Sequence, residues 1–165
     1  MTVEQTAEYI QSQCRYFEKG IIYDTDRHGR AFCELIIRNS AVENLPLTLT
    51  VTEDGCSISV GQFSNVTGST RMKPEEAIAA IEDIIADKII FVLAYKEDDD
   101  LGFGTPYFSR VFALTGENDD MSEEYDDFLE EISRPIKKLL RPFVSLKGRF
   151  FIFNFSGTVK KTINR

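Results

Sequence analysis

The hydrophobic positions of the chain follow two periodicities, one typical of helices and the other typical of strands. In three stretches an apolar residue recurs at every third or fourth position, which predicts an amphipathic helix. These helices are expected at residues 3–19, in the stretch that begins at Pro74, and at residues 121–140. Pro135 lies inside the last stretch, where it removes one backbone hydrogen bond and is expected to kink or end the helix.

Strand patterns account for most of the remaining hydrophobic residues. Residues 89–94 are apolar without alternation, which is typical of a strand that is covered on both faces. Residues 107–114 carry apolar side chains on both sides and are therefore expected beside that strand. Two further strands are predicted at residues 31–38 and 149–155, whereas residues 24–30 are polar and are expected to form a loop.

The clearest hairpin signal surrounds Asp54 and Gly55. Apolar residues alternate with Thr and Ser on both sides of this dipeptide, over residues 47–52 and 56–60. An Asp-Gly pair supplies the positive φ angles of a tight turn between two half-buried strands. Both strands would present a Thr/Ser face, which we expect to be solvated, with a ligand site as the alternative.

These patterns predict an α+β fold in the order α-β-β-β-α-β-β-α-β. We expect one mainly antiparallel sheet of about five or six strands, packed with three helices. A length of 165 residues suggests a single domain over residues 1–165. The basic C-terminal tail, from about residue 157, is expected to fray.

Composition narrows the class of protein. A hydrophobic content of 42% indicates a folded globular chain rather than a disordered one. No apolar run approaches the roughly 18 residues that a membrane span needs, and residues 1–8 lack the pattern of a secretion signal. The cysteines are odd in number and scattered through apolar patterns, as expected of reduced core thiols. We therefore expect a soluble cytoplasmic protein that does not associate with membranes.

The net charge of -8 is distributed unevenly along the chain. Residues 1–96 carry a net charge of -5, residues 97–131 carry -12, and residues 132–165 carry +9. The negative total argues against nucleic-acid binding, which needs cationic groups on phosphates. The asymmetry has two explanations: surfaces that face partners, or charges that pair within the fold.

The predicted order of elements resembles that of the class I type III secretion chaperones and the related YbjN-like domains. The similarity covers residues 3–140 and lies in element order, with no shared motif, and the strand at residues 149–155 departs from it. Those families are small, acidic, cytosolic α+β proteins, often dimers, that hold an extended segment of another protein. The resemblance implies a protein-binding role and admits a homodimer, but it assigns no functional residue.

Residues that could support nucleophilic catalysis form no recognisable constellation. His28 is the only histidine of the chain, so a Ser-His or Cys-His site would have to use it. It lies in the predicted polar loop, and neither a Ser nucleophile elbow nor a Cys signature occurs elsewhere. The cysteines lack the C-x-x-C spacing of a structural zinc site. We predict no catalytic residue, no metal site and no cofactor.

The leading hypothesis is a non-catalytic protein-binding module, chaperone-like or toxin-neutralising (immunity-type). It would use an acidic surface together with a sheet edge or an apolar groove. Its partner would be another protein with a basic surface, because the acidic segment would steer such a partner toward it. The candidate binding residues are Asp98, Asp99, Asp100, Phe103, Asp119, Asp120, Glu123 and Glu124.

Two alternatives belong to other classes of protein. The acids at residues 98–100 and 119–120 offer the oxygen ligands of a hard cation, which would suit a metal-assisted hydrolase, although their spacing does not match an EF-hand loop. The other alternative is a small-ligand-binding sheet domain with a pocket among Tyr107, Phe108 and Phe112. If these aromatic residues belong to the core instead, they form no ligand pocket.

Overall fold

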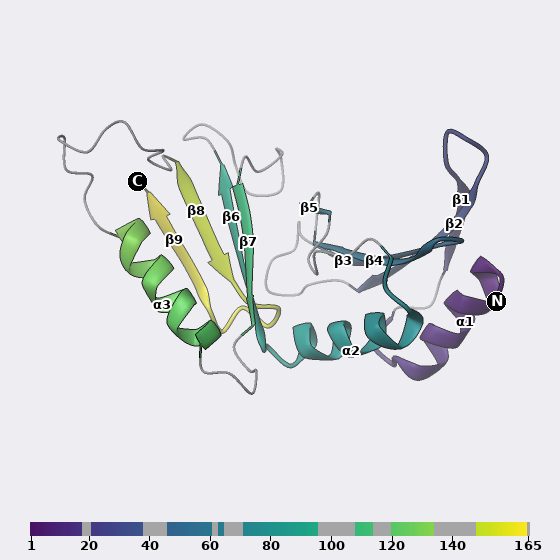
Figure 1. Ribbon diagram of the computed structural model, residues 1–165, viewed down its shortest axis with the longest axis horizontal. Helices are drawn as coiled ribbons and strands as arrows, with labels where there is room; N and C mark the ends of the chain where they lie inside the picture. Colours follow the sequence, from purple (N-terminus) through teal and green to yellow (C-terminus); the bar gives the residue numbers. More distant parts are fainter. Residues whose placement is uncertain are drawn as a thin grey trace. The chain divides into compact units, whose positions relative to one another are not determined.

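The computed structural model describes residues 1–17, 21–37, 46–60, 63–64, 71–95, 108–113, 120–133 and 148–164. Over these residues the chain forms three helices and two antiparallel sheets, so the predicted α+β class is confirmed (Figure 1). The contacts divide the chain into two compact units, Met1–Ile85 and Ala86–Arg165. The single domain of residues 1–165 stays a prediction. None of the described helices combines the length and hydrophobicity of a membrane span.

The single sheet of five or six strands is not confirmed. The described strands form a first sheet of five strands, in the order β1-β2-β3-β4-β5, and a second sheet of four, in the order β7-β6-β8-β9. All neighbouring strands are antiparallel. The first sheet lies in the first unit and the second sheet lies in the second unit.

The first unit packs two helices against one face of its sheet. Its elements are α1 (Val3–Gln13), β1 (Ile22–Thr25), β2 (Ala31–Ile37), β3 (Leu47–Thr52), β4 (Gly55–Val60), β5 (Phe63–Ser64) and α2 (Pro74–Ile85). Helix α1 contacts β2 and β3, and α2 contacts β4. Every second residue of the central strands is buried on the helix side: Cys33, Leu35, Ile37, Leu47, Leu49, Val51, Cys56, Ile58 and Val60.

Helix α1 begins where the sequence provides a cap. The Thr2 hydroxyl accepts a hydrogen bond from the Gln5 N–H at 3.2 Å, and the Gln5 side chain accepts one from the Thr2 N–H at 3.0 Å. This reciprocal capping box satisfies two N–H groups that the helix leaves unpaired. The helix ends at Gln13, because Cys14 is extended. It is therefore shorter than the helix predicted for residues 3–19.

Strand β1 corrects the prediction of a loop at residues 24–30. Ile22–Thr25 pairs along its length with β2, so that only the five residues after it form the turn. All four side chains of β1 are exposed. A strand that buries nothing gives no hydrophobic alternation, which explains why the sequence pattern did not predict it.

The second unit places α3 against its sheet. Its elements are β6 (Ile89–Tyr95), β7 (Phe108–Ala113), α3 (Asp120–Ser133), β8 (Arg149–Phe153) and β9 (Lys160–Asn164). Strand β6 lies between β7 and β8 and is buried on both faces, as its unbroken apolar sequence predicts. The core between the sheet and α3 consists of Ile90, Val92, Ala94, Phe112, Phe128, Ile132, Phe150 and Ile152.

Two predictions about the C-terminal third have different outcomes. Residues 160–164 form β9 and pair with β8, so the expected fraying of the tail is wrong for them. Val159 and Ile163 also pack against the core of the second unit, which fixes this strand. The predicted kink at Pro135 lies outside the described residues, since the described part of α3 ends at Ser133.

Candidate functional site

Most of the sequence-predicted binding residues lie outside the described part of the chain. These are Asp98, Asp99, Asp100, Phe103 and Asp119. Asp120 and Glu123 lie near the start of α3, where the structure describes the backbone but not their side chains. The metal-assisted alternative depends on the same acids and stays a prediction. Among the described side chains, no group of three His, Cys, Asp or Glu residues is placed to hold a metal ion.

Glu124 is held by a partner within its own unit. The Arg110 guanidinium lies 3.1 Å from the Glu124 carboxylate and 4.7 Å from the centre of the Phe112 ring. Arg110 is the only basic residue of the acidic segment at residues 97–131. Both partners of the ion pair are about half exposed, so the pair contributes little to stability. It shows that one acid of this segment is paired within the fold.

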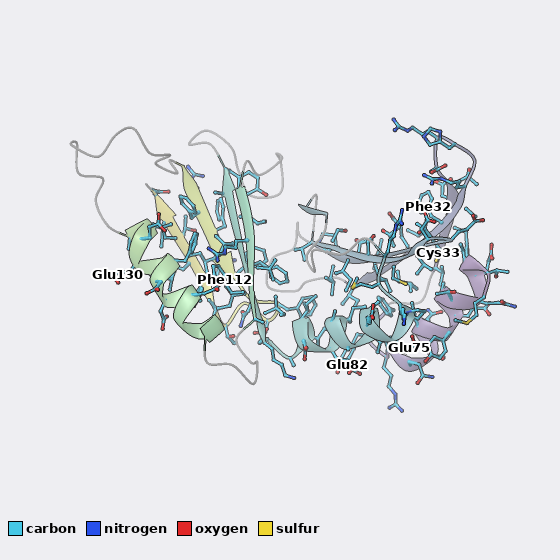
Figure 2. The ribbon with its side chains drawn as sticks, in the orientation of Figure 1. Phe32, Cys33, Glu75, Glu82, Phe112 and Glu130 are labelled. Atoms are coloured by element: carbon cyan, nitrogen blue, oxygen red, sulfur yellow. The ribbon has the colours of Figure 1, made fainter. Side chains whose placement is uncertain are left out.

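The other described acids of α3 lie on its outer side. Asp126, Asp127 and Glu131 are exposed, whereas Phe128 and Ile132 are buried against the sheet. In Figure 2, Glu130 points away from the second sheet while Phe112 lies between the sheet and α3. We call Asp126, Asp127 and Glu131 the α3 acidic face. These charges are held on a helix whose other side is anchored in the core.

Phe112 itself has a structural role. It is 1% exposed, and its ring centre lies 5.4 Å from the ring centres of Tyr125 and Phe128. This position agrees with the core interpretation of the aromatic residues on β7. Tyr107 lies outside the described residues, and only the backbone of Phe108 is described.

A pocket opens on the face of the first sheet that α1 and α2 leave uncovered. It has a volume of about 320 Å³. Figure 2 shows Phe32 and Cys33 on opposite sides of this sheet, and Phe32 is the one that lines the pocket. We call it the turn pocket, because two turns supply half of its lining residues. Its lining residues are Asp26, Arg30, Ala31, Phe32, Thr50, Thr52, Glu53 and Asp54.

Strand pairing brings these two turns together. The β1–β2 turn precedes Ala31, and the β3–β4 turn follows Thr52. Phe32 pairs with Thr52 in the antiparallel register of β2 and β3, so both turns lie at the same end of the sheet. Residues more than 20 positions apart in the sequence therefore share one pocket.

The β1–β2 turn is held by the side chain of Asp26. One carboxylate oxygen accepts hydrogen bonds from the N–H groups of His28 at 2.8 Å and Arg30 at 2.9 Å, and the other accepts one from Arg30 Nε at 2.8 Å. The hydrogen bond from the Arg30 backbone is the main reason that the pKa of Asp26 is lowered. Gly29 has a φ of 76°, a left-handed conformation that the tight turn requires and that glycine adopts without steric cost. The turn is therefore built by its own residues.

His28 lies in this turn and is held by two hydrogen bonds to its neighbours. Arg27 Nε donates a hydrogen bond to His28 Nε2 at 3.1 Å, and the His28 backbone is bound by Asp26. The described hydrogen-bond partners of His28 are therefore the Arg27 guanidinium, at the imidazole, and the Asp26 carboxylate, at the backbone, and neither is a nucleophile that the imidazole could activate.

The turn pocket has a negative balance of charge. Three carboxylates and one guanidinium line it, which leaves a net charge of −2. Arg30 lies 2.8 Å from Asp26 but 4.0 Å from Asp54, so its pairing with Asp26 is the closer one. Glu53 and Asp54 are exposed, and Glu53 takes part in none of the ion pairs of the described residues. This arrangement suits a cation rather than an anion.

The three cysteines are buried in the first unit, which disfavours their charged form. Cys14, Cys33 and Cys56 are free and buried, as the interpretation as core thiols predicts. Burial raises the pKa of Cys33 to about 11, with a further contribution from the charge of Glu4. Burial also raises the pKa of Cys56 to about 11. A high pKa suppresses the thiolate, which is the reactive form.

These thiols make stability depend on pH in the alkaline range. Because the folded pKa values lie above the ordinary value of 9.0, the folded state holds its protons longer than the unfolded state does. We expect the free energy of unfolding to be unaffected by these thiols below pH 9, and to fall as the pH rises from 9 to about 11. The loss should be on the order of 1–3 kcal/mol per thiol.

Urea denaturation under reducing conditions at a series of pH values measures this effect. The Cys33→Ala variant is the control, because it should show a smaller fall over the same range. An equal fall in both proteins would mean that other groups, such as the tyrosines, cause the dependence.

Comparisons with known proteins assign no family. No protein-family model, curated protein or solved structure matches this chain.

Proposed function

We propose that this chain is a non-catalytic cytoplasmic protein-binding module whose partner carries a basic surface. The observation that carries this proposal is the α3 acidic face, with Asp126, Asp127 and Glu131 exposed on a helix that is anchored by buried residues. The strongly negative charge of residues 97–131 has the same sign. A fixed array of like charges attracts a partner of opposite charge before contact.

Electrostatic steering acts mainly on the association rate. Attraction between exposed charges extends over a Debye length of about 8–10 Å at physiological salt, and it weakens as salt is added. Complementary charges raise association rates by about 10-fold to 1,000-fold. The α3 acidic face is suited to this role because the charges lie on one helix and do not need to be ordered when the partner arrives.

The uncovered face of the first sheet supports the same proposal by supplying a contact surface. Its residues alternate with the buried set and are partly exposed: Phe32, Glu34, Ile36, Thr48, Thr50, Thr52, Ser57 and Ser59. Aromatic, aliphatic and hydroxyl groups are mixed on this face, as on the surfaces of non-obligate complexes. A chaperone-like module would hold an extended segment of its partner there. An immunity-type module would instead cover a basic site on a toxin.

Affinity capture from the source lysate tests this function. The tagged wild-type protein is compared with a variant that carries Asp126→Asn, Asp127→Asn and Glu131→Gln. A control carries Glu8→Gln, Glu75→Gln and Glu82→Gln, which removes the same number of exposed charges from α1 and α2. We expect a basic protein on the wild type and on the control, with less of it at higher salt. The association rate with the α3 variant should be about tenfold lower at low salt.

Two results would contradict the proposal. One is the absence of any stoichiometric partner at either salt concentration. The other is a partner whose association rate does not change with salt and does not differ between the α3 variant and the control. In the second case binding would not be electrostatic, and the acidic helix would have no part in it.

A further inference from the structure

We propose that the turn pocket receives the guanidinium or ammonium end of an arginine or lysine side chain from an extended segment of the partner protein. This inference rests on the proposed function and deepens it, because it places a specific contact in the first unit. The α3 acidic face would attract a basic partner in general, whereas the turn pocket would recognise one cationic side chain.

The size of the pocket suits a single side chain. Pockets that bind small molecules span about 300–1,000 Å³, and the turn pocket is near the lower limit with about 320 Å³. Its walls come from two hydrogen-bonded turns and from paired strands, so it is present before any ligand binds. A preformed pocket does not have to be ordered when the ligand enters, which favours binding.

The carboxylates of the pocket have separate roles. Asp26 accepts three hydrogen bonds from within its own turn and is therefore occupied. Glu53 and Asp54 lie at the other turn and are exposed, with Asp54 only at the 4.0 Å limit of an ion pair with Arg30. An incoming cation would find two exposed carboxylates, of which only Asp54 has a described ion pair, at 4.0 Å. Hydrogen bonds between a guanidinium and a carboxylate are among the strongest that side chains form.

The uncharged lining also fits a cation with a hydrocarbon stem. Phe32 lines the pocket, and the electrons of an aromatic ring attract a guanidinium. Thr50 and Thr52 bring hydroxyl oxygens, which can accept hydrogen bonds from the cation. Asp24 lies on the same side of the sheet as Phe32, since the two are paired in β1 and β2. Its exposed carboxylate adds to the negative potential beside the pocket.

The second unit already contains the same combination of groups. There the Arg110 guanidinium lies 4.7 Å from the Phe112 ring centre and 3.1 Å from the Glu124 carboxylate. The turn pocket offers an aromatic ring and carboxylates of the same kind, on an uncovered face. An anionic ligand fits less well, because the only cation of the pocket, Arg30, is paired closely with Asp26.

An NMR titration with short peptides tests the inference. The probe is an extended peptide with one central arginine, and its matched control has citrulline there, which keeps the shape and removes the charge. Methylguanidinium, as a third probe, separates recognition of the side-chain end from recognition of the peptide. Binding in the pocket should shift the amide signals of Ala31, Thr50 and Thr52, which line it.

The pocket variant carries Glu53→Gln and Asp54→Asn, and its control carries Glu8→Gln and Glu82→Gln on α1 and α2. All four residues are exposed, so both variants are expected to fold like the wild type, which circular dichroism checks. We expect the arginine peptide to bind the pocket variant about tenfold more weakly than the wild type. The citrulline peptide should bind the wild type more weakly than the arginine peptide does, by a similar factor. The control variant should bind the arginine peptide as tightly as the wild type does.

The outcomes separate the inference from the proposed function. If the arginine peptide binds but shifts other amides, the inference is wrong and the general binding role survives. The same conclusion follows if the affinity is unchanged both when citrulline replaces arginine and when the pocket variant replaces the wild type. The inference is also wrong if neither methylguanidinium nor the peptide shifts the pocket amides. If the pocket binds arginine while capture yields no protein partner, the pocket is real and the proposed function is wrong.

Discussion

Replacement of Gly55 by alanine is expected to lower the free energy of unfolding by more than about 2 kcal/mol. Gly55 has a φ of 136°, a conformation that residues with a side chain rarely adopt. A Cβ atom at this position would lie 3.0 Å from the Cα and carbonyl carbon of Arg71 and from the carbonyl oxygen of Met72. All three are backbone atoms, which cannot rotate away as the end of a flexible side chain would.

The contacted backbone is itself fixed by hydrogen bonds. The Cys56 N–H donates to the Met72 carbonyl at 2.9 Å, and the Met72 N–H donates to the Cys56 carbonyl at 3.0 Å. Relief of the clash would therefore require this bridge to shift, and with it the connection into α2. Equilibrium urea denaturation measures the loss of stability.

Gly29→Ala is the matched control for this substitution. Gly29 also has a positive φ, of 76°, but a Cβ there would meet no atom within 4 Å. Its replacement should cost only the backbone strain of the left-handed conformation, about 1 kcal/mol. Equal losses for the two variants would show that strain alone decides the effect and that the close approach at Arg71 does not matter.

Local pattern predicted the elements that bury side chains. Helix α2 follows from its periodicity, and strand β6 follows from its unbroken apolar run. The β3–β4 hairpin follows from Asp54-Gly55 between alternating strands. The prediction missed strands β1 and β9, in which nearly all side chains are exposed. Such edge strands are held by hydrogen bonds to a neighbouring strand, and these leave no hydrophobic signature in the sequence.

The number of sheets could not be inferred from periodicity. A strand pattern shows which side chains are buried, but not which other strand lies beside it. In the second unit β6 pairs with β8, more than 50 residues further along the chain, and in the first unit β2 to β4 pair in sequence order. The two-sheet arrangement is a property of these pairings, and the sequence pattern fits one sheet as well as two.

The candidate site illustrates the same limit. The candidate binding acids lie in the segment of the sequence where acidic residues are most frequent, yet one of them, Glu124, is paired with Arg110 from β7. The turn pocket depends on Asp26 and Asp54, which come together only through the register of β2 with β3. The sequence does contain one usable signal, because Asp26 and Arg30 flank Gly29 at a spacing that suits a closed turn. The position of Asp54 beside this turn could be learned only from the structure.

Replacement of Asn154 by alanine is the other substitution with a large expected effect, about 2–3 kcal/mol of unfolding free energy. Asn154 is the buried polar residue of the described core, with 2% of its surface exposed. Its side chain donates a hydrogen bond to the Thr158 hydroxyl at 2.7 Å and accepts one from the Val159 N–H at 3.0 Å. Alanine would leave the Val159 N–H without this partner in a partly buried position, which costs more than the loss of an exposed hydrogen bond.

The loss should be felt mainly in β9, because these bonds close the turn that returns the chain from β8 to β9. We expect trypsin to cleave the variant faster after Lys160 and Lys161, in addition to the lower midpoint in urea. Ser156→Ala is the control, since it removes only exposed hydrogen bonds in the same turn and should cost less than about 0.5 kcal/mol. If both variants lost the same stability, or if cleavage after these lysines did not change, the side chain of Asn154 would not be what holds β9 to the sheet.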